Sequence, residues 1–347
     1  MRQHWTAARS WKSTAERVVV ILAGLLLGIA ATASAADTAL ELLNVSYDPT
    51  RELWRDLNDH FIPVYAKQTG ITLTIKQSHG GSGAQARAIV DGLGADVATL
   101  ALWPDTDAIR KAGLIANGWE QRLPNNSVAY TSTIVFVVRK GNPKGIKDWP
   151  DIVKPGIEIV TPNPKTSGNG KLSLLAAWGS VTQRGGTEEQ AREFITKLYK
   201  QTPVLDSGAR GSTITFSQKE IGDVHLTWEN EAYPEVAESN GKLEIVYPPI
   251  SILAEPPLAV VDANVKRKGT GEAAEAYLKF LYSDEGQEII AKNYYRPINP
   301  DVLKRHAAVF PDIQRFPITV LATDWTAVYD KFFVDGKIFD QIYQPGK

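Results

Sequence analysis

Short apolar stretches that resemble strands alternate with stretches of helical periodicity along most of this chain. Residues 40–45, 71–75 and 96–102 have the apolar pattern of strands, and residues 84–93 and 105–112 have the pattern of the helices that follow. The order strand, turn, helix is typical of α/β proteins, in which a mainly parallel sheet carries helices on both faces. The pattern therefore predicts an α/β fold.

The same order returns in the middle of the chain. Residues 133–138, 156–160 and 224–228 are predicted strands, and residues 172–179 and 188–199 are predicted helices. This second part therefore repeats the alternation of strands and helices seen in the first. The chain has no internal repeat, low-complexity tract or flexible linker, so we expect two lobes that share strands.

The N-terminal 35 residues have the pattern of a secretory signal peptide. Residues 1–17 contain four basic residues and one acidic residue, and an apolar run covers residues 18–30. A small-residue cleavage site, Ala33-Ser34-Ala35, follows the run. An uncleaved membrane anchor is the alternative, but the run is shorter than the ~20 residues that a bilayer span needs. We predict cleavage after Ala35 and a periplasmic protein.

Composition excludes several classes of site. The chain has no cysteine, which excludes disulfides, thiolate nucleophiles, cysteine-ligated zinc and iron–sulfur clusters. Its 38 basic and 39 acidic residues nearly cancel, which excludes a nucleic-acid binder that works through bulk positive charge. Neither an H-E-x-x-H motif nor an EF-hand loop is present. We therefore expect no metal and no cofactor.

Four turns rich in glycine, serine and other small or polar residues lie where predicted strands give way to helices: residues 46–49, 79–83, 165–169 and 206–212. The first N–H groups of a helix have no partner within the helix and carry partial positive charge. Glycine lets the backbone approach a ligand, and serine adds a hydroxyl donor. Helix capping is the simpler role for any one such turn, but several turns that converge in one cleft would bind a small oxyanion.

Catalytic motifs are incomplete in this chain. The run His79-Gly80-Gly81 resembles the oxyanion-hole turn of esterases, but no G-x-S-x-G nucleophile motif occurs. Residues 168–171 lack the glycine spacing of a phosphate-binding P-loop. We take the run at residues 228–231 to continue the strand at residues 224–228, and we interpret Glu229 and Glu231 as a hydrogen-bonding cluster at a lobe edge, not a catalytic pair. We expect no enzyme activity.

Six runs spread over nearly the whole predicted mature chain carry a family resemblance. They are NVSYDPTREL at 44–53, QSHGGSG at 77–83, NPKTSG at 163–168, LDSGARGS at 205–212, WENE at 228–231 and SILAEP at 251–256. With these motifs the chain resembles the periplasmic sulfate-binding proteins, the sulfate and thiosulfate solute-binding family of ABC importers. YSDEGQ at 282–287 with YRP at 295–297 resembles the helix pair of the wider solute-binding superfamily.

The resemblance implies the two-lobed type II periplasmic solute-binding fold, an α/β fold with mixed sheets flanked by helices and a ligand cleft between the lobes. We expect residues 36–128 in the first lobe, residues 129–254 in the second, and residues 255–347 back in the first lobe with a C-terminal helical segment. Hinge segments are expected near residues 129–133 and 255–258. The expected partners are sulfate and an inner-membrane ABC permease, with no nucleic acid, and we expect a monomer.

The resemblance also implies which groups contact the ligand. The implied donors belong to seven residues: Asp48, Ser82, Ser167, Gly168, Asn169, Ala209 and Trp228. Ser167 contributes its hydroxyl, Trp228 its indole N–H, and the others backbone N–H groups. Asp48 must keep its carboxylate away from the ligand. Many relatives have a second glycine where this chain has Asn169, but the contact is through the backbone, and asparagine tolerates left-handed conformations.

Such a set of donors suits sulfate, a fully deprotonated dianion that accepts hydrogen bonds on every oxygen. Phosphate near neutral pH still carries a proton, which would need an acceptor that this set does not offer. A thiosulfate-preferring protein of the same family is the nearest competing function, although such relatives tend to lack the run Trp228-Glu229-Asn230. Two other functions, of different classes, are also possible: an enzyme that acts on a sulfate or phosphate ester, and a structural envelope protein.

Trp228 also has a simpler interpretation, because a tryptophan on an apolar strand is commonly a core residue.

Overall fold

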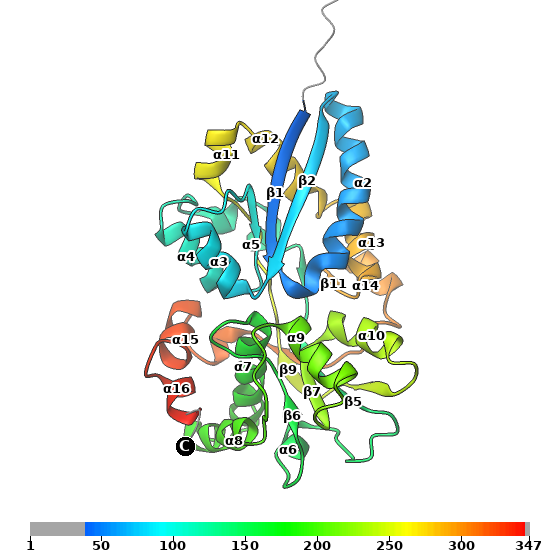
Figure 1. Ribbon diagram of the computed structural model, residues 1–347, viewed down its shortest axis with the longest axis vertical. Coiled ribbons are helices and arrows are strands. Elements are labelled where there is room, and N and C mark those ends of the chain that lie inside the picture. Colours follow the sequence, from blue (N-terminus) through cyan, green and yellow to red (C-terminus); the bar gives the residue numbers. More distant parts are fainter. Residues whose placement is uncertain (1–38, 344–347) are drawn as a thin grey trace, which may run out of the picture.

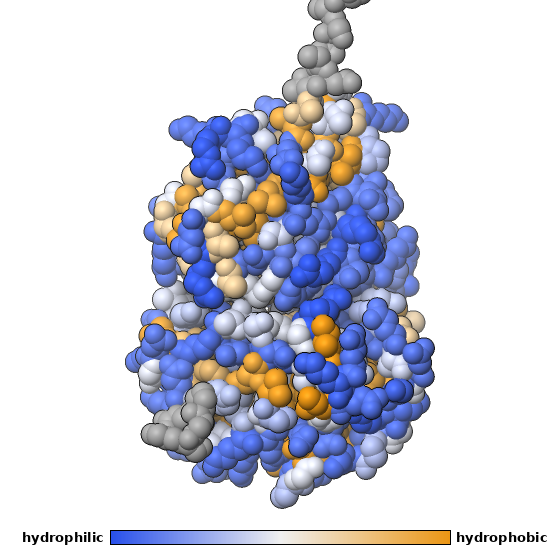
Figure 2. Space-filling model, viewed as in Figure 1, coloured by the Kyte–Doolittle hydropathy of each residue, from blue (hydrophilic) through white to orange (hydrophobic). Residues whose placement is uncertain are grey.

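The computed structural model describes residues 39–343 as two lobes stacked along the long axis of the molecule (Figure 1). The predicted signal peptide, with its cleavage after Ala35, lies outside the described residues. Within residues 39–343, no helix combines the length and apolarity that a membrane span requires. On the face shown in Figure 2, hydrophilic residues predominate and apolar residues form separate patches on both lobes.

The first lobe is built on a four-stranded sheet in the order β10-β3-β1-β2. β1 (Ala39–Tyr47) pairs in parallel with β2 (Thr72–Gly80) and β3 (Val97–Thr99), whereas β10 (Ala259–Val260) is antiparallel to β3. The predicted mainly parallel arrangement is confirmed for this sheet. Since β1 and β2 end at the same edge, the turns that follow them lie together, facing the second lobe (Figure 1).

The second lobe contains a mixed sheet in the order β6-β7-β5-β8, in agreement with the expected fold of mixed sheets flanked by helices. β6 (Ile159–Val160) is parallel to β7 (Val224–Trp228), but β5 (Ile134–Arg139) is antiparallel to both β7 and β8 (Leu243–Val246). The amino end of β5 therefore lies beside the carboxyl end of β7. A buried strand is apolar whichever way it runs, so the sequence pattern carried no information on direction.

Two passages of the chain between the lobes lie side by side: the first passage covers residues 128–133 and the second covers residues 254–258. Isolated bridges join Val128 to Pro257 and Ser132 to Ala254. The predicted hinge segments fall within these two passages. Segments that connect two lobes are the ones that can absorb a rotation of one lobe against the other, so the hinge stays a prediction for these passages.

A third passage was not predicted. It leads from β11 (Arg296–Pro297), which pairs with β4 (Tyr130–Thr131), to β12 (Gln314–Phe316), which pairs with β9 (Ile250–Ile252). Strands of two or three residues are too short for a periodic pattern to reveal them.

The helices of the second lobe include the C-terminal part of the chain. α7 (Gly168–Thr182) and α8 (Glu188–Lys200) share one buried apolar cluster with α15 (Trp325–Phe332) and α16 (Ile338–Ile342). The C-terminal helical segment therefore packs on the second lobe. The sequence-based lobe limits themselves stay a prediction.

In the first lobe, α2 (Arg51–Thr69) packs against the sheet and against two later helices. The remaining helical elements complete the two lobes and their connections. They are η1 (Asp48–Thr50), α3 (Ser82–Val90), α4 (Trp103–Lys111), η2 (Trp119–Gln121), α5 (Pro124–Ser127), α6 (Trp149–Ile152), α9 (Ala209–Thr213), η3 (Ile214–Gln218), α10 (Glu229–Glu238), α11 (Asp262–Lys268), α12 (Gly271–Phe280), α13 (Asp284–Lys292), α14 (Pro300–Arg305) and η4 (Ile318–Val320).

Candidate functional site

The structure brings all seven predicted site residues to one small cavity between the lobes. They are Asp48, Ser82, Ser167, Gly168, Asn169, Ala209 and Trp228. Tyr47, Pro49, Gly80 and Gly81 complete the lining. The cavity volume is about 10 Å³, far below the ~300–1,000 Å³ of sites for drug-sized molecules. The cavity has the size for a small ion.

Five of the seven residues occupy first turns of helical elements. Asp48 begins η1, Ser82 begins α3, Gly168 and Asn169 are the first two residues of α7, and Ala209 begins α9. N–H groups at these positions have no acceptor within their own helix. Between described residues, none of these five N–H groups makes any other backbone hydrogen bond. Two lobes thus present free N–H groups to one cavity.

Trp228 supplies a further free donor from the end of β7. Its side chain is fully buried, and its Nε1 has no hydrogen-bond partner among the described residues. The indole ring packs against Tyr47 of the first lobe, with 5.5 Å between the ring centres. An unpaired buried N–H costs about 1–3 kcal/mol, so an indole kept in this state at a cavity wall fits a ligand donor better than a core residue.

The two serine hydroxyls at the cavity differ in what they can offer. Ser167 Oγ accepts a hydrogen bond from the Gly170 N–H at 3.4 Å, which leaves its own O–H free to donate. Ser82 Oγ instead donates to Asp105 at 2.6 Å and accepts from the Ala101 N–H at 3.1 Å. The group that Ser82 can present is therefore its backbone N–H.

Asn169 does not use a left-handed conformation, contrary to the sequence argument. It lies within α7 and is not among the residues with positive φ. Its buried side chain donates to the Leu226 carbonyl at 3.3 Å and accepts from the Ser173 hydroxyl at 3.3 Å. The side chain ties α7 to β7, and the backbone N–H stays free.

The lobes approach so closely at the cavity that only glycine fits at several positions. A Cβ atom on Gly81 would lie 2.6 Å from the Thr166 carbonyl oxygen of the other lobe, and one on Gly168 would lie 2.5 Å from Ala101 Cβ. A Cβ atom on Gly208 would collide with the Asp48 carboxylate. These contacts cross from one lobe to the other, so the structure shows the closed arrangement.

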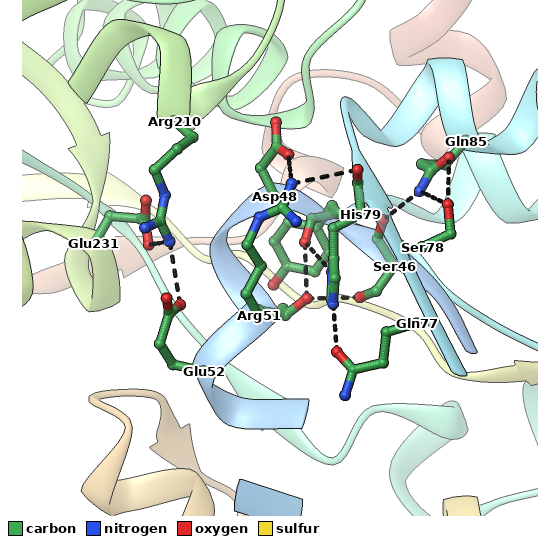
Figure 3. A network of polar contacts seen from close by, with 12 residues as sticks. Ser46, Asp48, Arg51, Glu52, Gln77, Ser78, His79, Gln85, Arg210 and Glu231 are labelled. Atoms are coloured by element: carbon green, nitrogen blue, oxygen red, sulfur yellow. Dashed lines mark hydrogen bonds and ion pairs between the residues drawn. The ribbon is translucent and has the colours of Figure 1, made fainter. Parts of the chain in front are cut away.

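Arginine side chains lie near the cavity, but acidic side chains contact them. Arg210 lies between Glu52 at 3.1 Å and Glu231 at 3.3 Å, and Arg51 contacts the Asp48 carboxylate at 2.9 Å (Figure 3). Among the residues that the structure describes, no lysine or arginine lines the cavity. The Asp48 carboxylate is thus engaged by Arg51, as the predicted role of the Asp48 N–H requires.

A second inter-lobe ion pair is fully buried. Lys171 of α7 contacts Asp105 of α4 at 3.2 Å, and Asp105 also accepts the hydrogen bond from Ser82. Sequence reasoning missed this pair because 66 residues separate its members. The pair holds the turn before α3 against the second lobe.

Among the described residues, the ring of His79 contacts groups other than a hydroxyl nucleophile. Its ring nitrogens contact the Gln77 side chain at 2.6 Å and the Tyr47 carbonyl at 3.3 Å (Figure 3). Burial, with help from the Arg51 charge, lowers the pKa of His79 to about 4. The ring is neutral near pH 7, and no hydroxyl nucleophile is among its partners.

The WENE run differs in structure from the prediction. Its acids do not lie on a strand, because β7 ends at Trp228 and α10 begins at Glu229. Glu229 contacts Arg296, Asn230 accepts from Ser132, and Glu231 contacts Arg210. The run is a hydrogen-bonding cluster, but one built at a strand-to-helix junction.

Glu231 should make stability depend on pH. Burial raises the pKa of Glu231 to about 8, although Arg210 opposes the shift. A raised folded-state pKa gives a stabilising contribution that is complete below the ordinary value of 4.5 and is lost as pH rises toward 8. We expect Glu231→Gln to lose less unfolding free energy than the wild type between pH 5 and 8 in urea titrations.

Glu244→Gln is the control for this prediction. Hydrogen bonds from Gly141 and Lys140 lower the pKa of Glu244, so its titration falls below the tested range. Parallel stability curves for the wild type and Glu231→Gln would contradict the assignment of the raised pKa.

Comparisons with known proteins agree with this geometry. Residues 54–296 match the family model described as bacterial extracellular solute-binding protein. The chain is 50% identical over 328 residues to a thiosulfate-binding protein of Pseudomonas aeruginosa, covering 94% of this chain and 97% of that one. It is 52% identical over 321 residues to a sulfate-binding protein of Escherichia coli, covering 92% and 97%. The solved structure of the sulfate-binding protein SubI from Mycobacterium tuberculosis aligns with a TM-score of 0.76 and 30% identity, covering 84% of this chain and 99% of that one.

Proposed function

The chain belongs to the bacterial extracellular solute-binding proteins, within the group of sulfate- and thiosulfate-binding relatives, and on that premise we propose that it binds sulfate between its lobes and delivers it to an ABC-type permease in the inner membrane. One observation carries the proposal. Free N–H and O–H donors from both lobes meet at one small cavity whose lining contains no lysine or arginine among the described residues.

The chemistry of the lining suits a dianion without a proton. Each oxygen of sulfate accepts hydrogen bonds, and a bond to a charged partner contributes about 1.5–3 kcal/mol. The partial positive charge at several helix N-termini adds to the attraction. A cavity lined with donors leaves no group to accept the proton of phosphate, so phosphate would bury an unpaired O–H.

Lobe closure changes the shape of the protein when the anion binds, and a permease can distinguish the closed form from the open form. Neither lobe alone surrounds the anion, so the anion stabilises the closed arrangement by completing donors from both sides. Hinge closure of this kind is a known behaviour of periplasmic binding proteins. We propose that the closed, sulfate-loaded form is the one that the permease receives, and that the protein works as a monomer without catalytic activity.

Isothermal calorimetry on residues 36–347 tests the proposed ligand. We expect a 1:1 enthalpy change with sulfate at pH 7, and an affinity for phosphate at least about fivefold lower because burying one unpaired O–H costs about 1–3 kcal/mol. The phosphate deficit should persist from pH 6 to pH 9, since phosphate keeps at least one proton throughout. Equal affinities for the two anions would contradict the donor-only site.

Thiosulfate is the second candidate ligand, because a relative named for it is 50% identical over most of this chain. The same titration with thiosulfate and molybdate decides between the anions. The Trp228 indole at the cavity wall favours sulfate, since thiosulfate carries a sulfur atom, a weaker acceptor, in place of one oxygen.

We also propose a periplasmic location, reached through cleavage of the N-terminal signal peptide after Ala35. N-terminal sequencing of the protein recovered from a periplasmic fraction checks both points. A mature chain that begins with Ala36 is the expected result, and a protein that stays with the membrane fraction would contradict it.

A further inference from the structure

A buried ion pair joins the third passage between the lobes to the residue next to Trp228. Arg296 contacts Glu229 through two hydrogen bonds of 2.7 Å, one from Nε and one from a terminal nitrogen. Both side chains are almost completely buried, with exposed fractions of 4% and 0%. The same guanidinium donates to the Pro311 carbonyl at 2.8 Å. This geometry fixes the planar guanidinium in one orientation.

The two partners belong to different parts of the molecule. Arg296 lies in β11, where it pairs with Thr131 of β4 in the first passage. Glu229 is the first residue of α10 and directly follows Trp228. Its backbone N–H donates to the Thr133 carbonyl at 2.9 Å, again in the first passage. The ion pair therefore connects two passages with the strand end that carries the indole donor.

Asn230 adds the second passage to this connection. Its side-chain oxygen accepts from the Ser132 hydroxyl at 3.1 Å. Ser132 in turn exchanges two backbone hydrogen bonds of 3.0 Å with Ala254 of the second passage. Two successive residues after Trp228 are thus hydrogen-bonded to the first and third passages, and Ser132 links them to the second.

The stability of the folded protein does not by itself explain why this ion pair is buried. Replacing a buried ion pair by apolar residues of similar volume is often neutral or stabilising, because both charges lose their hydration on burial. A bidentate pair does impose one relative orientation on the elements that it joins. Here those elements are the hinge and the end of β7, so orientation is the property that matters.

We propose that Glu229 and Arg296 are positioning residues that hold the Trp228 indole in register with the hinge, so that ligand contact at Trp228 is coupled to lobe closure. This inference rests on the proposed function, since it takes Trp228 as a ligand donor. The pair does not touch the ligand. Rotation at the three passages moves the segment around Glu229, and with it the indole.

Arg296→Lys tests the coupling, because lysine keeps the charge but cannot form the bidentate contact. We expect the variant to fold, to bind sulfate about 5- to 150-fold more weakly, the usual range for coupling between sites, and to compact incompletely with sulfate in small-angle X-ray scattering. Its Trp228 indole resonance in ¹⁵N–¹H spectra, assigned through Trp228→Phe, should shift even without sulfate.

Arg139→Lys is the matched control. Arg139 also makes several hydrogen bonds to carbonyl groups, those of Phe216, Ile221 and Gly222, but it lies at the far end of β5 from the cavity. Arg139→Lys should lower the unfolding temperature without moving the Trp228 resonance or the sulfate affinity. Ser132→Ala, which removes only the hydroxyl bond to Asn230, is the milder second variant and should show the same effects in smaller measure.

The outcomes separate this inference from the proposed function. Absence of sulfate binding in the wild type would refute the proposed function and this inference with it. Wild-type sulfate binding together with unchanged affinity, compaction and Trp228 resonance in folded Arg296→Lys and Ser132→Ala would overturn the inference alone. Should Arg296→Lys not fold, Ser132→Ala decides by the same three readouts.

Discussion

Gly81→Ala is expected to weaken sulfate binding by about 5- to 150-fold while leaving each lobe folded. The new Cβ atom would lie 2.6 Å from the Thr166 carbonyl oxygen and 3.2 Å from the Ser207 carbonyl oxygen, both in the opposite lobe. Backbone oxygens cannot move aside as a flexible side chain can, and overpacking of this kind costs about 1–3 kcal/mol. The cost arises only in the closed arrangement, because the open lobes do not meet.

Gly168→Ala should act in the same way, since its Cβ atom would lie 2.5 Å from Ala101 Cβ across the cleft. The double variant should close still less readily than either single variant. Calorimetry gives the loss of affinity, and X-ray scattering gives the loss of compaction with sulfate.

Gly94→Ala serves as the control for the glycine substitutions. Its Cβ atom would meet only the end of the Arg267 side chain, at 3.7 Å. Affinity and compaction should match the wild type. If Gly81→Ala compacted and bound sulfate as the wild type does, the closed-state contacts would not govern binding.

Removing single donors should have effects of similar size. Trp228→Phe keeps an aromatic ring beside Tyr47 but loses the indole N–H, and Ser167→Ala loses only the hydroxyl. Each change removes a hydrogen bond to a charged ligand, worth about 1.5–3 kcal/mol, so each should lower the affinity by about 10- to 150-fold. Calorimetry with sulfate measures the loss directly.

Ser82→Ala separates a hydroxyl that binds from one that does not. The Ser82 hydroxyl already bonds to Asp105 and Ala101. Its removal should therefore lower the free energy of unfolding and should leave the number of hydrogen bonds to the ligand unchanged. Wild-type affinity in both Trp228→Phe and Ser167→Ala would show that this cavity is not the binding site.

The parts of the site that could be predicted from the sequence are local. Turns such as residues 79–83 and 165–169 are recognisable because their glycine and serine residues stand directly before a predicted helix. The N–H groups that they present belong to the first turn of that helix, so no distant part of the chain is needed to identify them. The family resemblance then assigned donors to these turns. The structure places all seven residues around one cavity, but the contact of each with a ligand stays a prediction.

The parts that could not be predicted depend on pairing over long distances. The direction of β5 is invisible in an apolar run, and the two-residue β11 is too short to show a pattern. The partner of Glu229 lies 67 residues away in the chain. Such pairs carry no local signal, and the hinge that they build appears only in three dimensions.

The central claim is that uncharged amide, hydroxyl and indole groups enclose a doubly charged anion. A crystal structure of the sulfate-bound protein tests it most directly. We predict that every sulfate oxygen accepts hydrogen bonds, at about 2.5–3.2 Å, from the N–H and O–H groups of the seven cavity residues, while Lys171 and Arg210 keep their carboxylate partners. A lysine or arginine nitrogen bonded to the anion, or sulfate bound outside this cavity, would contradict it.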